Sequence, residues 1–182
     1  MCSSDLAAML IGFTGPMRAG KTTAAMHLVI SRGFIRCSFA QPVRRECAMM
    51  LATLDGESYP RIEEEMRASA TKEKYRGLMQ WYGVFRRQQD PDHWVRLLRR
   101  RLDIMLSRDY SICIDDVRFE NEAAMIHELG GKVVLVDSSA SPLCDHESER
   151  DWQTMAVDYT LFNENCIEAL HQDIDEMMDD LT

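Results

Sequence analysis

The stretch IGFTGPMRAGKTTAAM, residues 11–26, joins an apolar run to a glycine-bracketed loop and then to a segment that favours helix. Its loop, Gly15 to Thr22, fits the spacing G-x-x-x-x-G-K-[ST] between a strand and a helix. Glycines at those places let the backbone curl, so that successive N–H groups point at phosphate oxygens beside the positive end of the helix dipole. The stretch therefore predicts a strand, a phosphate-binding loop and a helix in direct succession.

The predicted ligand of this loop is a nucleoside triphosphate. Lys21 would reach the β- and γ-phosphates, and the Thr22 hydroxyl would bind magnesium. The residues that we expect to contact the nucleotide are Gly15, Arg18, Ala19, Gly20, Lys21, Thr22 and Thr23.

Short apolar runs on either side of the loop predict further strands, and helix-favouring segments separate them. The runs span residues 8–14, 34–40, 110–115, 132–137 and 158–163. Most lack strict alternation of polar and apolar residues, which is typical of strands buried on both faces. Strands that alternate with helices indicate right-handed crossovers and a parallel sheet. The sequence therefore predicts an α/β fold with a parallel five-stranded sheet and helices on both faces.

Residues 51–106 contain no predicted strand, and we expect a helical insertion there within a single domain that spans residues 1–182. Its clearest helix is residues 90–106, where Asp90 can cap the start and Pro91 suits the first turn. An apolar stripe supports it, formed by Trp94, Leu97, Leu98, Leu102 and Met105. A second amphipathic helix with an acidic outer face is predicted near the end of the sequence, on Ile167, Leu170, Ile174 and Met177.

The formal net charge of −9 disfavours non-specific attraction to nucleic acid or to an anionic membrane. The charge is uneven, because residues 61–101 hold eleven of the twenty-one basic residues while residues 145–182 hold twelve acidic residues and one basic residue. Seventeen of the basic residues are arginine, whose planar fork suits bidentate contact with phosphate. We expect phosphate-binding arginines in the middle of the chain, and no stable nucleic-acid or membrane partner.

The six cysteines form no C-x-x-C pair and no zinc-like spacing with histidine, so we expect reduced thiols rather than a zinc site. The first residues lack a basic leader, and no apolar run reaches the length of a membrane span. These features favour a cytoplasmic protein.

Two aspartates, Asp115 and Asp116, stand at the end of the predicted strand that begins at residue 110. The carboxyl edge of a parallel sheet is where ligands bind beside a phosphate loop, so a carboxylate there can hold magnesium directly or through water. The alternative is a pair of solvated turn residues. We favour Asp116 as the decisive member because it begins the run D-x-R-F, which also brings Arg118 to this edge.

Several motifs together resemble the phage-type deoxynucleoside monophosphate kinases, relatives of the adenylate kinase group. In chain order they are GPMRAGKTT, FIRCSFAQPVRREC, LMQWYGVFRRQQDPDHWV, DDVRFENEAAMIHELGG and DHESE, and they extend from about residue 10 to residue 170. The D-x-R-F-x-N-E run and the L-x-Q-x-x-G run before arginine and D-P-D-H-W are more specific than the phosphate loop. One departure is Gly83-Val84-Phe85, where such kinases often have Gly-Thr-Glu before the lid arginine.

The resemblance implies a P-loop kinase fold with a helical monophosphate-binding and lid insertion. It implies magnesium-dependent transfer of the γ-phosphoryl group of ATP to a deoxynucleoside 5′-monophosphate, in the host cytoplasm if a phage encodes the chain. Lys21, Asp116, Arg86 and Arg87 would be catalytic, with the two arginines in the lid. The residues expected at the acceptor are Arg44 and Arg45 on its phosphate, Arg118 at the sheet edge, and Phe39, Trp81 and Tyr82 around its base. Whether the chain is a monomer or a homodimer stays open, as does its base preference.

Two other functions compete with this interpretation. A kinase of the same fold could act on another acceptor, such as a modified base in DNA or a cofactor precursor. A nucleotide-dependent switch or ATPase is the second alternative, but the guanine-reading element N-K-x-D is absent and the nearest match is TKEK at residues 71–74. His146, with Ser148 and Glu149, matches an H-x-S-E pattern of the family, and we assign it no chemistry.

Overall fold

The computed structural model of the chain describes residues 8–68, 70–138, 154–164 and 166–181. The chain forms two compact units. The first comprises Met1–Ser38 and Arg99–Thr182, and we call it the sheet unit. The second is Phe39–Leu98, which we call the helical unit.

The sheet unit is built on a five-stranded parallel sheet in the order β2-β3-β1-β4-β5. Its strands are β1 (Leu10–Thr14), β2 (Ile35–Cys37), β3 (Ile112–Ile114), β4 (Lys132–Asp137) and β5 (Tyr159–Phe162). All five lie within the apolar runs of the sequence, and the predicted fold class is confirmed. Strand β1 is central, so the loop that follows it leaves the middle of the sheet's carboxyl edge.

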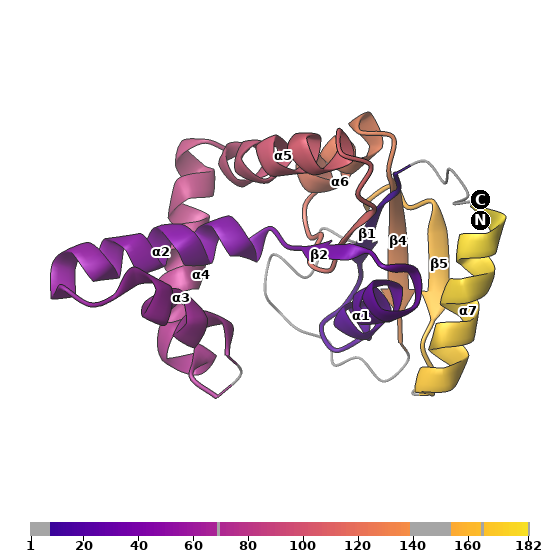
Figure 1. The fold of residues 1–182 in the computed structure, drawn as a ribbon, viewed down its shortest axis with the longest axis horizontal. Coiled ribbons are helices and arrows are strands. Elements are labelled where there is room, and N and C mark those ends of the chain that lie inside the picture. Colours follow the sequence, from indigo (N-terminus) through magenta and orange to yellow (C-terminus); the bar gives the residue numbers. More distant parts are fainter. Residues whose placement is uncertain (1–7, 69, 139–153, 165, 182) are drawn as a thin grey trace. The chain divides into compact units, whose positions relative to one another are not determined.

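Helices cover both faces of the sheet. Successive side chains of a strand point to opposite sides, so each strand packs against helices on both faces. Ile11 and Phe13 join a buried core with residues of α1 (Lys21–Arg32) and α7 (Ile167–Asp180). Figure 1 shows α1 in front of the sheet and α7 alongside β5. Gly12 faces the other way, where a Cβ would lie 2.4 Å from Ile126 Cδ1 on α6 (Glu120–Glu128).

The helical unit contains α2 (Ala40–Asp55), α3 (Tyr59–Arg67), α4 (Lys72–Gln89) and the first part of α5 (His93–Leu106). It has a buried core of its own, formed by Cys47, Ala48, Ile62, Met66 and Tyr75. Within residues 39–68 and 70–98 there is no strand, but the unit begins twelve residues earlier than the predicted insertion. The single-domain organisation of residues 1–182 stays a prediction.

The two predicted amphipathic helices are present. Asp90 accepts a hydrogen bond from the Asp92 amide at 3.2 Å and pairs with Arg96, and α5 begins at His93 rather than at Pro91. On α7, Leu170, Ile174 and Met177 are buried, whereas Ile167 is 57% exposed and lies outside the stripe. None of the described helices is both long and apolar enough to cross a membrane.

Candidate active site

The loop between β1 and α1 has the backbone that its glycines predicted. Gly15 has φ 129°, Gly20 has φ 107° and Arg18 has φ 66°. A side chain at Gly15 would also collide with the main chain, because its Cβ would lie 2.2 Å from Val136 O. Both the positive φ and the lack of room for a Cβ therefore require glycine at position 15.

Lys21 and Thr22 begin α1 and point to different partners. The Lys21 Nζ donates hydrogen bonds to the carbonyls of Gly15, at 2.7 Å, and Pro16, at 2.6 Å. The Thr22 hydroxyl donates to Asp115 Oδ2 at 3.0 Å. The Lys21 side chain therefore reaches back to the start of the loop, and the Thr22 side chain faces the end of β3.

Asp115, not Asp116, makes the contact with Thr22. Alternation along β3 gives the reason: Cys113 faces α1, where its Sγ lies 3.6 Å from Ala25 O, and Asp115 is two residues further on the same face. Asp115 is buried, with 8% of its surface exposed, whereas Asp116 is half-buried. Asp116 stays the prediction of the D-x-R-F motif, and the contact with Thr22 makes Asp115 the candidate that the structure favours.

Two residues at this edge were missed by the sequence analysis. Arg36, on β2, places its Nε 3.6 Å from Asp115 Oδ2. Asn163, directly after β5, donates from Nδ2 to the carbonyl of Ala19 at 2.9 Å and so braces the phosphate loop. The signal for Arg36 was a single charge inside an otherwise apolar strand, and the signal for Asn163 was a polar residue at a strand's carboxyl end.

The D-x-R-F-x-N-E run forms the turn into α6. Its glutamate, Glu122, is 1% exposed and accepts hydrogen bonds from the amides of Arg118, at 2.8 Å, and Phe119, at 3.3 Å. A buried carboxylate that binds two main-chain amides fixes the path of this turn. The Arg118 residue itself is exposed beside it.

Four of the predicted acceptor and lid arginines belong to the helical unit, whereas Arg118 belongs to the sheet unit. Arg44 and Arg45 lie on α2, the first half-buried and the second exposed. Arg86 and Arg87 lie in the last turn of α4, and both are half-buried.

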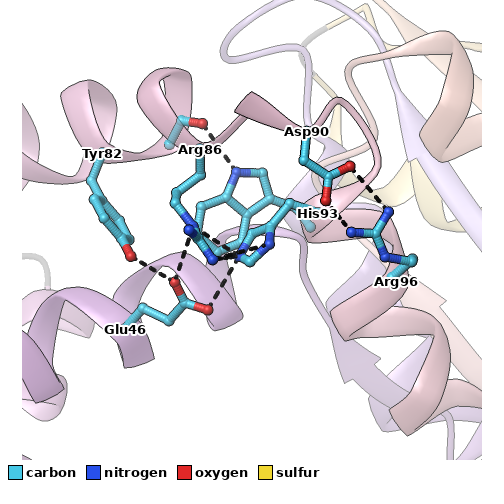
Figure 2. Close-up of polar contacts among 8 residues, drawn as sticks. Glu46, Tyr82, Arg86, Asp90, His93 and Arg96 are labelled. Carbon is cyan, nitrogen blue, oxygen red and sulfur yellow. Dashed lines mark hydrogen bonds and ion pairs between the residues drawn. The ribbon is translucent and has the colours of Figure 1, made fainter. Parts of the chain in front are cut away.

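Arg86 belongs to a cluster centred on Glu46, in which Figure 2 shows three side chains that converge on one carboxylate. Glu46 Oε2 accepts from the Tyr82 hydroxyl at 2.8 Å and lies 3.8 Å from Arg86 Nε. Glu46 Oε1 lies 3.2 Å from His93 Nε2. The Arg86 guanidinium lies against the His93 ring, with Nη2 3.3 Å from Nδ1 and 3.2 Å from Nε2.

The three aromatic residues expected at the base differ in accessibility. Trp81 is 59% exposed and stacks on Phe85, with ring centroids 5.5 Å apart. Tyr82 is half-buried, and burial together with its hydrogen bond to Glu46 raises the pKa of Tyr82 to about 12. Phe39 is 4% exposed at the start of α2. Trp81 is therefore the most exposed of the three.

A sequence profile described as deoxynucleotide monophosphate kinase matches residues 50–174, more than half of the chain. The chain belongs to the deoxynucleotide monophosphate kinase family. The match begins after the phosphate loop, so the profile and the loop are separate observations that agree. The resemblance inferred from the motifs is confirmed, and with it the assignment of the chain as a kinase.

Other proteins resemble the chain over nearly its whole length. A protein of Acanthamoeba polyphaga mimivirus, provisionally named a deoxynucleotide monophosphate kinase, is 29% identical, and the alignment covers 94% of this chain and 96% of that protein. Dephospho-CoA kinase from Campylobacter jejuni has a TM-score of 0.55 at 13% identity, over 97% of this chain and 99% of its own. A sugar kinase from Janibacter sp. HTCC2649 has a TM-score of 0.53 at 14% identity, over 94% and 95%. At these identities the two structures show a shared fold only.

The residues of this family member fit a magnesium ion at the sheet edge. Magnesium prefers oxygen ligands and is usually bound by one or two carboxylates, waters and substrate phosphates. The Thr22 hydroxyl and the Asp115 carboxylate supply such oxygens, 3.0 Å apart. Across the described ranges, no group of three or more His, Cys, Asp or Glu side chains could hold a metal ion. His146, Ser148 and Glu149 lie outside the described residues.

Proposed function

We propose that the chain uses ATP and magnesium to phosphorylate deoxynucleoside 5′-monophosphates to diphosphates. The observation that supports this most is the contact between Thr22 and Asp115 beneath a glycine-rich loop, in a chain of the deoxynucleotide monophosphate kinase family. Phosphoryl transfer needs little covalent chemistry from a protein, mainly alignment of the reactants and positive charge around the transferred group.

Lys21 is the proposed cation at the transferred phosphoryl group. Its ammonium is held over the loop by the carbonyls of Gly15 and Pro16, which are neutral acceptors. A phosphate oxygen is a stronger acceptor, because charge-assisted hydrogen bonds are about twice as strong as neutral ones. When ATP binds, Lys21 is expected to give up a hydrogen bond to a loop carbonyl and to bind the β- and γ-phosphates instead. The loop amides are expected to donate to the remaining phosphate oxygens.

Thr22 and Asp115 are the proposed protein ligands of magnesium, with Asp116 as the alternative carboxylate. The ion would neutralise charge on the phosphates while they are aligned for transfer. The hydroxyl of Thr22 already points at Asp115, so the two oxygens need little rearrangement to face one ion.

The acceptor is proposed to bind through the helical unit. Arg45 is exposed on α2 and suits the acceptor's phosphate, with Arg44 beside it as the alternative. Arg87 is our preferred lid arginine, with Arg86 as the alternative. Trp81, which is 59% exposed, is the proposed contact for the base. The assignments of Arg118, Phe39 and Tyr82 to the acceptor stay predictions.

The charge of the whole chain supports a small acceptor rather than a nucleic acid. A net charge of −9 opposes binding of a long polyanion, whereas a single phosphate needs only a local arginine. We propose no stable nucleic-acid partner and a location in the cytoplasm of the cell, or of the host if a phage encodes the chain.

A product assay tests this function directly. The four common deoxynucleoside monophosphates and their ribose counterparts are each incubated with the chain, ATP and magnesium, and the products are separated by anion-exchange chromatography. We expect a deoxynucleoside diphosphate and ADP in equal amounts, and neither product when EDTA replaces magnesium. ADP formed without any diphosphate would identify an ATPase and contradict the proposal.

A further inference from the structure

Asp115 Oδ2 has two partners in the sheet unit. Thr22 donates to it at 3.0 Å, and Arg36 Nε lies 3.6 Å from the same oxygen. The two side chains of the ion pair differ in environment, because 8% of the Asp115 side chain and 39% of the Arg36 side chain are exposed. The proposed magnesium carboxylate is thus already paired with a cation.

The sheet register places Arg36 there. Arg36 on β2 is paired with Cys113 on β3, so both side chains project from the same face. Asp115 is two residues beyond Cys113 on that face, at a diagonal position that a long side chain reaches. A charge that served only to keep the edge strand β2 soluble would point to water. The Arg36 side chain reaches a buried carboxylate instead.

A buried carboxylate needs a counter-charge, because an uncompensated charge inside a protein is costly. Without metal, Arg36 supplies part of that compensation. It also lowers the repulsion between Asp115 and an incoming triphosphate, since both are anions. A magnesium ion held by Thr22 and Asp115 would compete with Arg36 for this carboxylate, because the ion would be repelled by a guanidinium that stayed beside it.

We propose that Arg36 is the resident counter-ion of Asp115 and that magnesium displaces it when nucleotide binds. Arg36 thereby strengthens metal-free nucleotide binding and weakens the magnesium-dependent gain in affinity. This inference rests on the proposed function, because it takes Thr22 and Asp115 as the magnesium ligands. It assigns to Arg36 a positioning role, not a catalytic one.

The test measures binding, not turnover. Isothermal titration calorimetry gives the affinity for the non-hydrolysable analogue AMPPNP with magnesium and with EDTA, and the ratio of the two is the magnesium gain. In Arg36→Gln we expect the gain to rise about threefold to tenfold, the size expected for removal of one partly exposed charge beside a ligand carboxylate. The rise should come mainly from weaker binding in EDTA.

Arg32→Gln is the matched control, because it removes the same charge from the same unit at a distant ion pair with Asp175 and Asp179. Its magnesium gain should equal that of the wild type. Arg36→Lys, whose shorter side chain moves the charge away from Asp115, should give an intermediate magnesium gain. It replaces Arg36→Gln in the test if circular dichroism shows that Arg36→Gln is unfolded.

Other outcomes overturn the inference. An equal loss of AMPPNP affinity with and without magnesium would make Arg36 a phosphate ligand, and a reduced gain would make it a support for the metal. Asp115→Asn separates this failure from failure of the proposed function. If Asp115→Asn and Thr22→Ala both keep the wild-type gain, the metal site itself is wrong. If they abolish the gain while Arg36→Gln leaves it unchanged, only the role of Arg36 fails.

Discussion

The phosphate loop of the sheet unit and the Glu46 cluster of the helical unit fix their charged groups by different means. In the loop the main chain holds the cation, since Lys21 donates to the carbonyls of Gly15 and Pro16. In the cluster side chains hold one another, since Glu46 on α2 binds Tyr82 and Arg86 of α4 and His93 of α5. A site fixed by the backbone depends on a few residue types at strict spacing, whereas a site fixed by side chains permits many substitutions.

The difference predicts how each region responds to change. Loss of Lys21 leaves a preformed loop without the ammonium that its carbonyls hold. Loss of one cluster member leaves partners that can still contact each other. The largest effects on turnover should therefore come from the loop and the smallest from the cluster.

The largest expected effect is that of Lys21→Ala. It should lower kcat on the order of 100-fold or more while the protein stays folded, because it removes a charge that follows the migrating phosphoryl group. Steady-state rates and circular dichroism check this. Lys132→Ala is the control, since Lys132 pairs with Asp158 at 3.0 Å on β4. Wild-type turnover in Lys21→Ala would remove the assignment of the loop.

Next in size is the effect of Asp115→Asn on the magnesium requirement. We expect the magnesium concentration for half-maximal rate to rise about tenfold or more, because a carboxylate ligand is lost. Asp116→Asn should have a smaller effect, since Thr22 faces Asp115. Magnesium titrations of both variants decide the matter. A larger shift in Asp116→Asn would favour Asp116, the first residue of D-x-R-F, over Asp115 as the magnesium ligand.

The acceptor and lid arginines should separate in their kinetics. Arg45→Ala should mainly raise the acceptor's KM, and Arg87→Ala should mainly lower kcat, each by roughly tenfold. A contact present before and during the reaction is uniform binding, whereas a lid arginine is engaged most strongly in the transition state. Arg76→Ala is the control, because Arg76 pairs with Glu73 one turn away on α4. Loss of acceptor affinity alone in both variants would refute the lid role of Arg87.

The smallest expected effect is that of Tyr82→Phe, which removes one hydrogen bond to Glu46 and should cost about 1 kcal/mol of stability with little change in turnover. The pKa of Tyr82 is raised to about 12 in the folded protein, so its stabilisation is complete below pH 10 and is lost as the pH rises towards 12. Denaturant unfolding at pH 8 and pH 11 measures this. The stability gap between wild type and Tyr82→Phe should narrow at pH 11, and a constant gap would contradict it.

The difference between the phosphate loop and the Glu46 cluster also explains which features could be predicted from the sequence. The loop and the five strands follow from spacing and periodicity, because glycine, lysine and buried apolar runs have few substitutes at those places, and the family follows from the motifs that resemble it. The choice between Asp115 and Asp116 as the proposed magnesium carboxylate was harder, since the two are adjacent and only strand alternation distinguishes them. Arg36 was missed because its partner lies on a neighbouring strand 79 residues away in the chain. The engagement of Arg86 by Glu46 depends on helix packing that no local pattern encodes.

The measurement that tests the central claim most directly compares free and strand-borne acceptors. Initial rates of label transfer from γ-labelled ATP are measured on the panel of deoxynucleoside monophosphates and on single- and double-stranded oligonucleotides, including modified-base versions, at low and physiological salt. We predict that at least one free monophosphate is phosphorylated far faster than every oligonucleotide, because the chain's charge of −9 opposes a long polyanion. Faster transfer to any oligonucleotide than to every free monophosphate would contradict the account and identify a kinase that acts on DNA.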